Sequence, residues 1–331
     1  MGFDRDVLKM DAAAVAEELT AALRTDVLET LRRRGAVVGI SGGLDSSVVL
    51  ALCARALGAG RVLGVMMPEQ DSSPSSVDLA RLVADQLGVE TALEELTPAL
   101  TGLGCYRRRD EAIRRAFPEF TADFKAKIGL PGNVLDSDAL NVFTLTIIAP
   151  DGEEKSKRLN LRDYLQIVAA SNFKQRSRMT MLYYHAELRN YAVVGTPNRN
   201  EHDQGFFVKW GDGGYDVGPI RHLFKTQVYQ LAEFLGVPAE IRQATPTTDT
   251  YSAPSSQEEF FFRLPFETLD LLWYALDHGV PAAEAAQVMG LAEEQVERAY
   301  ADILRKGRTT EYLRMAPIEY GRRAAGEGAA G

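Results

Sequence analysis

The sequence predicts an α/β protein built on a parallel, Rossmann-like sheet, and three observations support this prediction. A β-branched run over 36–40 ends at a glycine-rich loop, apolar residues then recur at helical spacing over 44–57, and a second apolar run follows at 62–68. Two buried strands joined through a helix run parallel and cross over with a right hand. The start of the chain therefore indicates a parallel, right-handed α/β sheet.

The same alternation continues along the chain. A helix over 75–88 opens with serine and closes with glycine, and a third strand is expected at 89–96. The buried-strand signal returns at 191–196, and an amphipathic helix over 225–238 ends at a glycine and a proline. We expect the α/β core to extend to about residue 250.

Residues 101–163 break this rhythm and are predicted to be an insertion. An arginine-rich helix is expected at 104–117, and a β-hairpin joins 140–148 to the charged stretch 155–161 across a Pro-Asp-Gly turn. A long helical pattern then covers 164–189.

After a stretch rich in Pro, Ser and Thr, the chain becomes helical near 266–278, 282–289 and 291–306, and its Gly- and Ala-rich tail is predicted to be disordered. Gly290, between the last two of these helices, could indicate a helix-turn-helix. Their acidic residues would face any phosphate, so two packed surface helices are favoured over a nucleic-acid reader.

Composition excludes several classes of protein. The 331 residues are 46% hydrophobic and 25% charged, with a net charge of −9, which is ordinary for a globular protein and disfavours diffuse binding of nucleic acid or anionic membranes. We expect a cytoplasmic protein, because no apolar run is long enough to span a membrane and the N-terminus lacks a signal peptide. Cys53 and Cys105 form no CxxC pair and fit a reducing compartment.

The strongest motif is GISGGLDSS, over 39–47, where the first strand turns into the first helix. Adjacent glycines allow a ligand close to the backbone, the helix start presents unpaired N–H groups, and serines add hydroxyl donors. These features predict a phosphate cradle; the alternative is a plain glycine-rich turn. The loop has neither the Gly-Lys-Ser/Thr of a Walker A motif nor the GxGxxG spacing of a dinucleotide fold. Asp45 adds an oxygen ligand suited to Mg²⁺.

This loop resembles the pyrophosphate-binding loop of the N-type ATP pyrophosphatases, which adenylylate a substrate and release pyrophosphate. Within that superfamily, three further stretches resemble the NAD synthetase pattern: NFKQRSRM (172–179), VVGTPNRNEHDQGFFVKWGDGGYDVGPIRHLFKTQV (193–228) and LGVPAEIRQATPTTD (235–249). The resemblance implies a catalytic domain over 1–260, with 101–163 inserted, and a helical extension over 261–331.

The resemblance also implies an ATP site and two Mg²⁺ ligands, Asp45 and Glu201. Lys225 matches a lysine that meets the ATP phosphates, so Asp45, Glu201 and Lys225 form the expected catalytic set. On residue type alone, Glu201 would be interpreted as a solvated loop carboxylate. Lys225 would be interpreted as a lysine in the first turn of a helix, a place where the helix dipole disfavours a cation. The implied ATP-binding residues are Gly39, Ile40, Ser41, Gly42, Gly43, Leu44, Asp45, Ser46, Thr196, Lys225 and Thr247.

Arg176, Lys209 and Asp216 match positions that bind deamido-NAD in the family, although Arg176 could instead lie on a solvated helix face. Two departures from the family pattern concern this substrate. Tyr312 and Leu313 stand where the family has a His-Lys pair. Glu258 and Glu259 replace an Asp-Glu pair and precede an aromatic stretch, 260–266, whose phenylalanines we assign to the core or to a subunit interface rather than to a base-stacking platform.

The activity that the resemblance implies is amidation of deamido-NAD to NAD⁺ with ATP and Mg²⁺, through an acyl-adenylate that ammonia attacks. The chain begins about 35 residues before the first strand, so we expect free ammonia or a separate glutaminase subunit as the nitrogen source. A homodimer is expected from the same resemblance. The rival readings are an amide ligase for another carboxylate, a tRNA-modifying thiolase and a nucleotide sensor.

Overall fold

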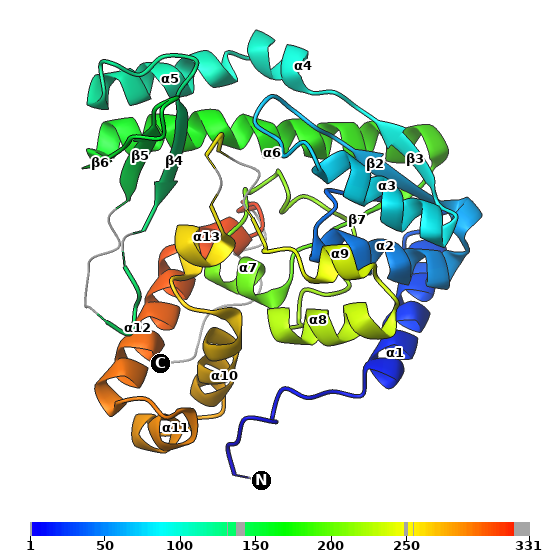
Figure 1. Ribbon diagram of the computed structural model, residues 1–331. Helices are drawn as coiled ribbons and strands as arrows, with labels where there is room; N and C mark the ends of the chain where they lie inside the picture. The colour runs from blue at the N-terminus through cyan, green and yellow to red at the C-terminus, as the bar shows by residue number, and fades with distance from the viewer. Residues whose placement is uncertain (1, 131, 137–142, 248–250, 254, 321–331) are drawn as a thin grey trace.

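The computed structural model describes residues 2–130, 132–136, 143–247, 251–253 and 255–320. Its centre is a four-stranded sheet in the order β3-β2-β1-β7, with every neighbouring pair parallel (Figure 1). These strands are β1 (Ala36–Gly39), β2 (Val62–Met66), β3 (Glu90–Leu93) and β7 (Ala192–Val194). The predicted α/β fold class is therefore confirmed.

The sheet is buried on both faces, which explains the continuous apolar runs of its strands. Val38 and Val194 point into the larger core with helices α1 (Ala12–Thr25), α2 (Leu44–Leu57) and α8 (Lys225–Phe234). The alternate residues Val37 and Val193 pack on the other face against Ala186 of the long helix α6 (Leu161–Arg189). The period of two along each strand sends neighbouring side chains to opposite helical layers.

The remaining helices follow the predicted order, with small differences at their ends. The expected 75–88 and 104–117 helices are α3 (Ser76–Leu87) and α5 (Cys105–Ala116), and α6 begins three residues before the predicted start because Asn160 caps it. Four short helices were not predicted: α4 (Thr97–Gly102), α7 (Arg199–Gln204), α9 (Ala239–Arg242) and α13 (Glu311–Arg314).

The insertion contains a second sheet with antiparallel order β4-β5-β6. The predicted hairpin is confirmed as β5 (Thr144–Ile148) and β6 (Glu154–Arg158), while β4 (Lys125–Gly129) was not predicted because its lysines interrupt the apolar pattern. Ile128, Leu145 and Ile147 pack below α5 and α6 in a core of their own. Residues 140–142 of the predicted strand lie outside the described residues.

The three predicted C-terminal helices are confirmed as α10 (Phe266–Asp277), α11 (Ala282–Met289) and α12 (Glu293–Thr309). They form one apolar cluster with Phe224, and Phe3 and Leu8 from the start of the chain join it. The division into 1–260 and 261–331 stays a prediction, and the tail over 321–331 lies outside the described residues.

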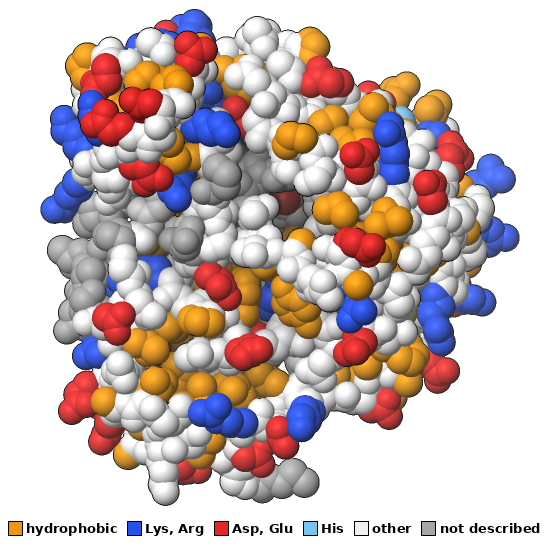
Figure 2. Space-filling view, viewed as in Figure 1, with side chains coloured by type: hydrophobic (Ala, Val, Ile, Leu, Met, Phe, Trp, Pro, Cys, Tyr) orange, Lys and Arg blue, Asp and Glu red, His pale blue; other side chains and the backbone are white. Residues whose placement is uncertain are grey.

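Positive and negative side chains are interspersed on one face of the molecule. On the face drawn in Figure 2, lysine and arginine side chains alternate with aspartate and glutamate rather than gathering in one field. Within the described part of the chain, no helix is long and apolar enough to cross a bilayer.

Candidate active site

The SGGLDS loop joins β1 to α2 as predicted, and its backbone conformation requires glycine. Gly42 has φ +76°, and a Cβ atom there would lie 2.6 Å from the backbone oxygen of Ser76. Ser46 Oγ donates to Gly43 O at 3.0 Å and lies 3.3 Å from the N–H of Ser41, which donates to it. Since Gly43 is the N-cap of α2 and has no side chain, the first N–H groups of that helix face the cavity rather than a cap.

Asp45, Glu201 and Lys225 meet beside this loop, although 180 residues separate the first from the last. Lys225 is 1% exposed, and its Nζ forms an ion pair with Asp45 Oδ2. Asn198 joins the two acids: its Nδ2 donates to Asp45 Oδ1 at 3.1 Å, and its N–H donates to Glu201 Oε2 at 3.2 Å. The anion that compensates this lysine at a helix N-terminus is therefore Asp45.

Glu201 occupies an electrostatically unfavourable place. Burial, together with the nearby Asp45 carboxylate, raises the pKa of Glu201 to about 8, against the lowering effect of Lys225. Two carboxylates that line one cavity and share the partner Asn198 fit a hard divalent cation such as Mg²⁺. The described residues contain no group of three or more His, Cys, Asp or Glu side chains placed to hold a metal. Phosphate and water oxygens would therefore have to complete the shell of a bound Mg²⁺.

A second layer of buried polar groups fixes α7 and α8 relative to each other. Asp270 of α10 is 0% exposed and accepts hydrogen bonds from Asn200 Nδ2, from the Thr226 N–H at 2.9 Å and from Thr226 Oγ1 at 2.8 Å. Asn200 Oδ1 in turn accepts from the Lys225 N–H at 3.0 Å. The C-terminal helices thus hold the helix start that carries Lys225, a connection that no local sequence pattern predicts.

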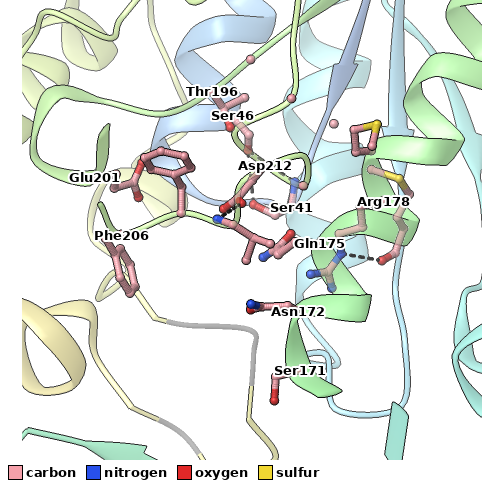
Figure 3. Close-up of a pocket in the computed structure, with 18 of the residues that line it drawn as sticks. Ser41, Ser46, Ser171, Asn172, Gln175, Arg178, Thr196, Glu201, Phe206 and Asp212 are labelled. Atoms are coloured by element: carbon pink, nitrogen blue, oxygen red, sulfur yellow. Dashed lines mark hydrogen bonds between the residues drawn. The ribbon is translucent and has the colours of Figure 1, made fainter. Parts of the chain in front are cut away.

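Two cavities adjoin at the loop. The first, of about 330 Å³, is lined by the whole stretch Ser41–Ser46, by Lys225 and by Thr247, so it collects most of the predicted ATP-binding residues. The second, of about 410 Å³, shares Ser41, Ser46, Thr196, Glu201 and Asp212 with the first. Gly39 and Ile40 line only this larger cavity, which runs along α6 (Figure 3).

The three residues expected to bind deamido-NAD do not line either cavity within the described structure. Lys209 Nζ donates to Tyr312 O and Met315 O, each at 2.8 Å, and Arg176 Nη2 donates to Lys209 O at 3.4 Å. Asp216 accepts from Tyr183 Oη at 2.9 Å and from the Val193 N–H at 2.8 Å, which holds the end of β7. The substrate role of these three residues stays a prediction.

Two charged residues that the sequence reading omitted do line the cavity. Arg178 donates to Met67 O at 3.3 Å, and Asp212, whose pKa is raised to about 6 by burial, accepts from the Val208 N–H at 2.7 Å. Figure 3 shows both near Ser41. The helical period of α6 was the signal that could have found Arg178, because it shares one face with the cavity-lining Gln175 and Leu182.

The aromatic run after Glu258 divides between core and cavity. Phe262 is fully buried, which fits the core assignment, whereas Phe260 and Phe261 pack at the edges of two apolar clusters and also line the larger cavity. The choice between core and subunit interface for these two residues stays a prediction. Glu258 accepts from the Phe266 N–H at 2.8 Å and so caps α10, and the side chain of Glu259 lies outside the described residues.

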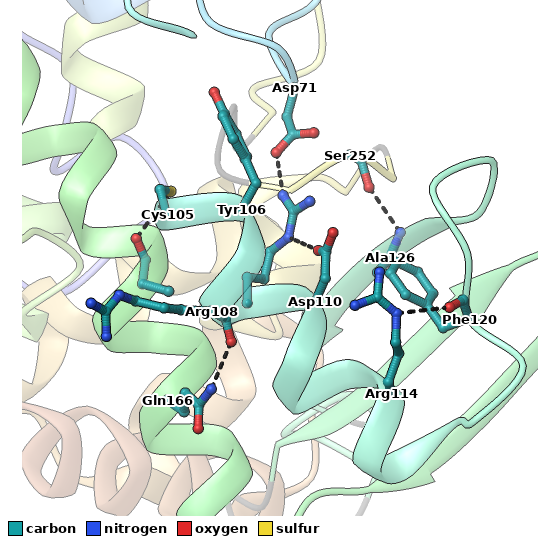
Figure 4. Close-up of polar contacts among 12 residues, drawn as sticks. Asp71, Cys105, Tyr106, Arg108, Asp110, Arg114, Phe120, Ala126, Gln166 and Ser252 are labelled. Carbon is teal, nitrogen blue, oxygen red and sulfur yellow. Dashed lines mark hydrogen bonds and ion pairs between the residues drawn. The ribbon is translucent and has the colours of Figure 1, made fainter. Parts of the chain in front are cut away.

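The arginines of the insertion serve packing and attachment. Arg109 is 5% exposed and forms ion pairs with Asp71 and Asp110, while Arg107 forms an exposed pair with Glu111. Figure 4 shows these contacts at Asp71 and Asp110, and two further attachments of the insertion: Gln166 Nε2 to Arg108 O at 2.8 Å, and the Ala126 N–H to Ser252 Oγ at 2.9 Å.

Comparison with known proteins identifies the family. The sequence model described as NAD synthase matches residues 15–117 and 141–317. The NH(3)-dependent NAD(+) synthetase of Mesorhizobium japonicum is 53% identical over 312 residues, covering 94% of this chain and 98% of the relative. The chain belongs to the NAD synthase family.

Two further members of the NAD synthase family also match this chain over nearly its whole length. The NH(3)-dependent NAD(+) synthetase of Rhizobium meliloti is 49% identical, covering 95% of this chain and 94% of the relative. Among solved structures, the NH3-dependent NAD synthetase of Campylobacter jejuni matches with a TM-score of 0.59 at 21% identity, covering 94% of this chain and 99% of that one. At that identity the structural match supports the fold alone.

Proposed function

We propose that this chain amidates deamido-NAD with ammonia, at the cost of ATP cleavage to AMP and pyrophosphate. The observation that carries the proposal is the meeting of Asp45, Glu201 and Lys225 around the SGGLDS loop, on a cavity that opens into a second one. One cavity suits a triphosphate, and the adjoining one leaves room for a second reactant. The family to which the chain belongs supports the choice of that reactant.

In the first step, an oxygen of the nicotinate carboxylate attacks the α-phosphorus of ATP, and the bond to the pyrophosphate oxygen breaks. The α2 N–H groups and the hydroxyls of Ser41 and Ser46 would hold the departing pyrophosphate. Lys225 would exchange its partner Asp45 for a phosphate oxygen, which keeps its buried charge paired throughout.

Asp45 and Glu201 are the residues that would hold Mg²⁺. When bound, Mg²⁺ would supply charge neutralisation for the phosphates. The cation would also favour the ionised form of Glu201, whose pKa is raised without it.

In the second step, ammonia attacks the acyl carbon of the adenylate, AMP leaves with the bonding electrons of the acyl–oxygen bond, and the amide nitrogen loses a proton. Asp212 faces both cavities and can accept that proton, because its pKa of about 6 leaves it ionised at neutral pH. A free carboxylate would not react with ammonia, since its leaving group would be an oxide; adenylylation supplies AMP instead.

The test is a turnover assay with ATP, MgCl₂, ammonium and deamido-NAD, in which NAD⁺, AMP and pyrophosphate should appear in equal amounts. Omission of deamido-NAD should stop pyrophosphate release. Turnover with another carboxylic acid and no NAD⁺ would favour the rival amide ligase, and nucleotide binding without pyrophosphate release would favour a sensor. Replacement of ammonium by glutamine should give little product from the isolated chain.

A homodimer is part of this proposal through the resemblance to the family. Sedimentation equilibrium of the purified chain, with and without deamido-NAD, measures the mass of the assembly. A monomer under both conditions would count against the homodimer.

A further inference from the structure

The loop between β2 and α3, residues 67–75, forms a second wall of the two adjoining cavities. Ser73 and Ser75 line the smaller cavity, which the SGGLDS loop also lines, and Ser72 lines the larger one. We call residues 67–75 the serine loop. Serine hydroxyls can donate to phosphate oxygens, so this loop is placed to contact the triphosphate of the proposed function.

The end of the serine loop packs against the SGGLDS loop. A Cβ atom on Gly42 would lie 2.6 Å from the backbone oxygen of Ser76, the first residue of α3, and 2.7 Å from Leu79 Cβ. Ser76 is tied to the serine loop, because its N–H donates to Ser73 O at 3.1 Å and its Oγ donates to the same oxygen at 2.8 Å. A displacement of the serine loop would therefore disturb the SGGLDS loop as well.

Two carboxylates of the serine loop belong to a buried cluster of charges. Lys174 Nζ of α6 donates to Glu69 Oε1 at 3.0 Å and to Asp71 Oδ2 at 2.6 Å. Arg109 of α5 forms an ion pair with the same Asp71 oxygen, which Figure 4 shows. Tyr106 Oη, also of α5, donates to Glu69 Oε2 at 2.8 Å. We call these five residues, Glu69, Asp71, Tyr106, Arg109 and Lys174, the anchor cluster.

The anchor cluster fixes one geometry of the serine loop. Each of its ionic side chains is at most 7% exposed. Burial alone would raise the pKa of Asp71, but Lys174 and Arg109 outweigh burial and hold that pKa below its usual value. Apolar side chains could often replace such ion pairs without loss of stability, whereas charged partners must stay at hydrogen-bond distance once they are buried. The cluster therefore specifies position more than it adds stability.

A hydrogen-bonded turn connects the anchor cluster to the cavity wall. The Glu69 N–H donates to Ser72 Oγ at 3.0 Å, and the Ser72 N–H donates to Glu69 O at 2.9 Å. Since Asp71 lies within this turn, its partners fix the backbone that enters the wall at Ser72. The five residues of the anchor cluster line neither of the two cavities, so their effect on a ligand must pass through the serine loop.

The insertion supplies two members of the anchor cluster from helix α5, which lies along α6 (Figure 1). A second ionic contact of α5 has a different destination. Arg115 Nε donates to Asp163 Oδ1 at 2.7 Å, near the start of α6. The Arg115–Asp163 pair holds one helix to the other, whereas the Arg109–Asp71 pair holds the insertion to the serine loop. This difference separates attachment of the insertion from positioning of the loop.

We propose that the insertion positions the serine loop for ATP binding through the anchor cluster, with Arg109 as its positioning residue. The inference rests on the proposed function, which takes the smaller cavity as the site of the triphosphate. The serines would contact the phosphates both before and during the reaction, so a displaced loop weakens ATP binding and leaves the bond-breaking step unchanged. The KM for ATP is therefore the quantity that the anchor cluster sets.

The experiment compares wild type with Arg109→Met, Asp71→Asn, the double variant of both, and Arg115→Met. Methionine removes the guanidinium and keeps an apolar stem, and asparagine keeps the shape of aspartate without its charge. Arg115→Met is the matched control, because it takes a cation of α5 from the buried Asp163 and leaves the serine loop untouched. Kinetics with each substrate varied in turn give KM and kcat. Calorimetric titration with α,β-methylene-ATP, which cannot release pyrophosphate, gives nucleotide affinity without turnover, and thermal unfolding checks the fold.

We expect the KM for ATP and the Kd for α,β-methylene-ATP to rise about tenfold in Arg109→Met and about fivefold in Asp71→Asn, as is usual within one ion-pair network. The kcat and the KM for deamido-NAD should stay within about twofold of wild type. The double variant should lie within about twofold of Arg109→Met, because both substitutions break the same pair. Arg115→Met should keep the wild-type KM for ATP, even where it lowers the melting temperature as much as Arg109→Met does.

An unchanged KM for ATP in Arg109→Met and Asp71→Asn would overturn the inference, as would an equal rise in Arg115→Met or losses that multiply in the double variant. If Arg109→Met does not fold, Asp71→Asn decides, since each cation of the anchor cluster keeps another carboxylate partner in that variant. Absence of NAD⁺ formation by wild type would instead overturn the proposed function. The calorimetric titration separates the two failures, because it measures nucleotide binding without the second substrate.

Discussion

The two ends of the larger cavity are built by different means. At the phosphate end, short loops after parallel strands bring Ser41, Thr196 and Glu201 together within buried hydrogen bonds and one ion pair. At the insertion end, an antiparallel sheet and the start of α6 present stacked rings. Chemistry on phosphates needs fixed charges on rigid elements, whereas stacked rings contribute apolar packing and carry no charge. Substitutions should therefore change turnover at one end and substrate affinity or stability at the other.

The largest effect is expected at the phosphate end. Asp45→Asn removes a charge that pairs with Lys225 and that would hold Mg²⁺, so kcat should fall about 10³-fold, the scale of losing one preorganised electrostatic group. Asparagine keeps an oxygen that can accept from Lys225, so the melting temperature should fall by only a few degrees. Steady-state NAD⁺ formation measures kcat, and thermal unfolding measures the melting temperature. A variant that melts far lower while kcat changes little would place Asp45 among structural residues.

The next effect concerns the insertion's attachment to the core. Lys174 is 1% exposed, and its Nζ donates to Glu69 Oε1 at 3.0 Å and to Asp71 Oδ2 at 2.6 Å, while Tyr106 Oη donates to Glu69 Oε2 at 2.8 Å. Lys174→Met leaves two buried carboxylates without this cation, which should cost about 3–5 kcal/mol of unfolding free energy. Urea denaturation measures this loss. At saturating substrates, the folded fraction should keep most of its kcat, in contrast to Asp45→Asn.

A pH effect tests the buried carboxylate Asp270, which holds the start of α8 next to Lys225. Burial raises the pKa of Asp270 from its usual value of 3.8 to about 6, so its neutral form is the one that the fold favours. The stability due to Asp270 is complete below pH 4 and is lost as the pH rises through 6, by about 3 kcal/mol in all. Asp270→Asn should remove this loss. The difference in unfolding free energy between wild type and variant should therefore change between pH 4 and 7 and stay constant above pH 7.

The smallest effect belongs to the surface of the insertion. The Arg107–Glu111 pair spans one helical turn of α5, and its arginine side chain is 64% exposed. Arg107→Ala should change the unfolding free energy by less than about 0.5 kcal/mol and leave kcat/KM for deamido-NAD unchanged. A clear loss in kcat/KM for deamido-NAD alone would instead extend the substrate site to this helix.

The phosphate end could largely be predicted from the sequence, because its signals are local. Gly42 and Gly43 between an apolar strand and a helix fix the loop's shape, and Asp45 lies within that same loop. The strand at 125–129 was missed because alternating lysines hide its apolar face until β5 pairs with it. Asp270 was missed for a related reason, since its partners Asn200 and Thr226 lie far away in the sequence.

By itself, the sequence determined the parallel α/β core and the glycine-rich loop after its first strand, because backbone conformation and strand burial depend on neighbouring residues. The catalytic set of Asp45, Glu201 and Lys225 was implied by the resemblance to the family and stays a prediction. Tertiary structure decided which charges meet. It paired Lys225 with Asp45, left Arg178 and Asp212 on the cavity, and directed Lys209 toward the C-terminal segment. It also brought Phe143 of the insertion onto Tyr164, a contact that no local pattern encodes, since it forms only when a second sheet packs against the start of a long helix.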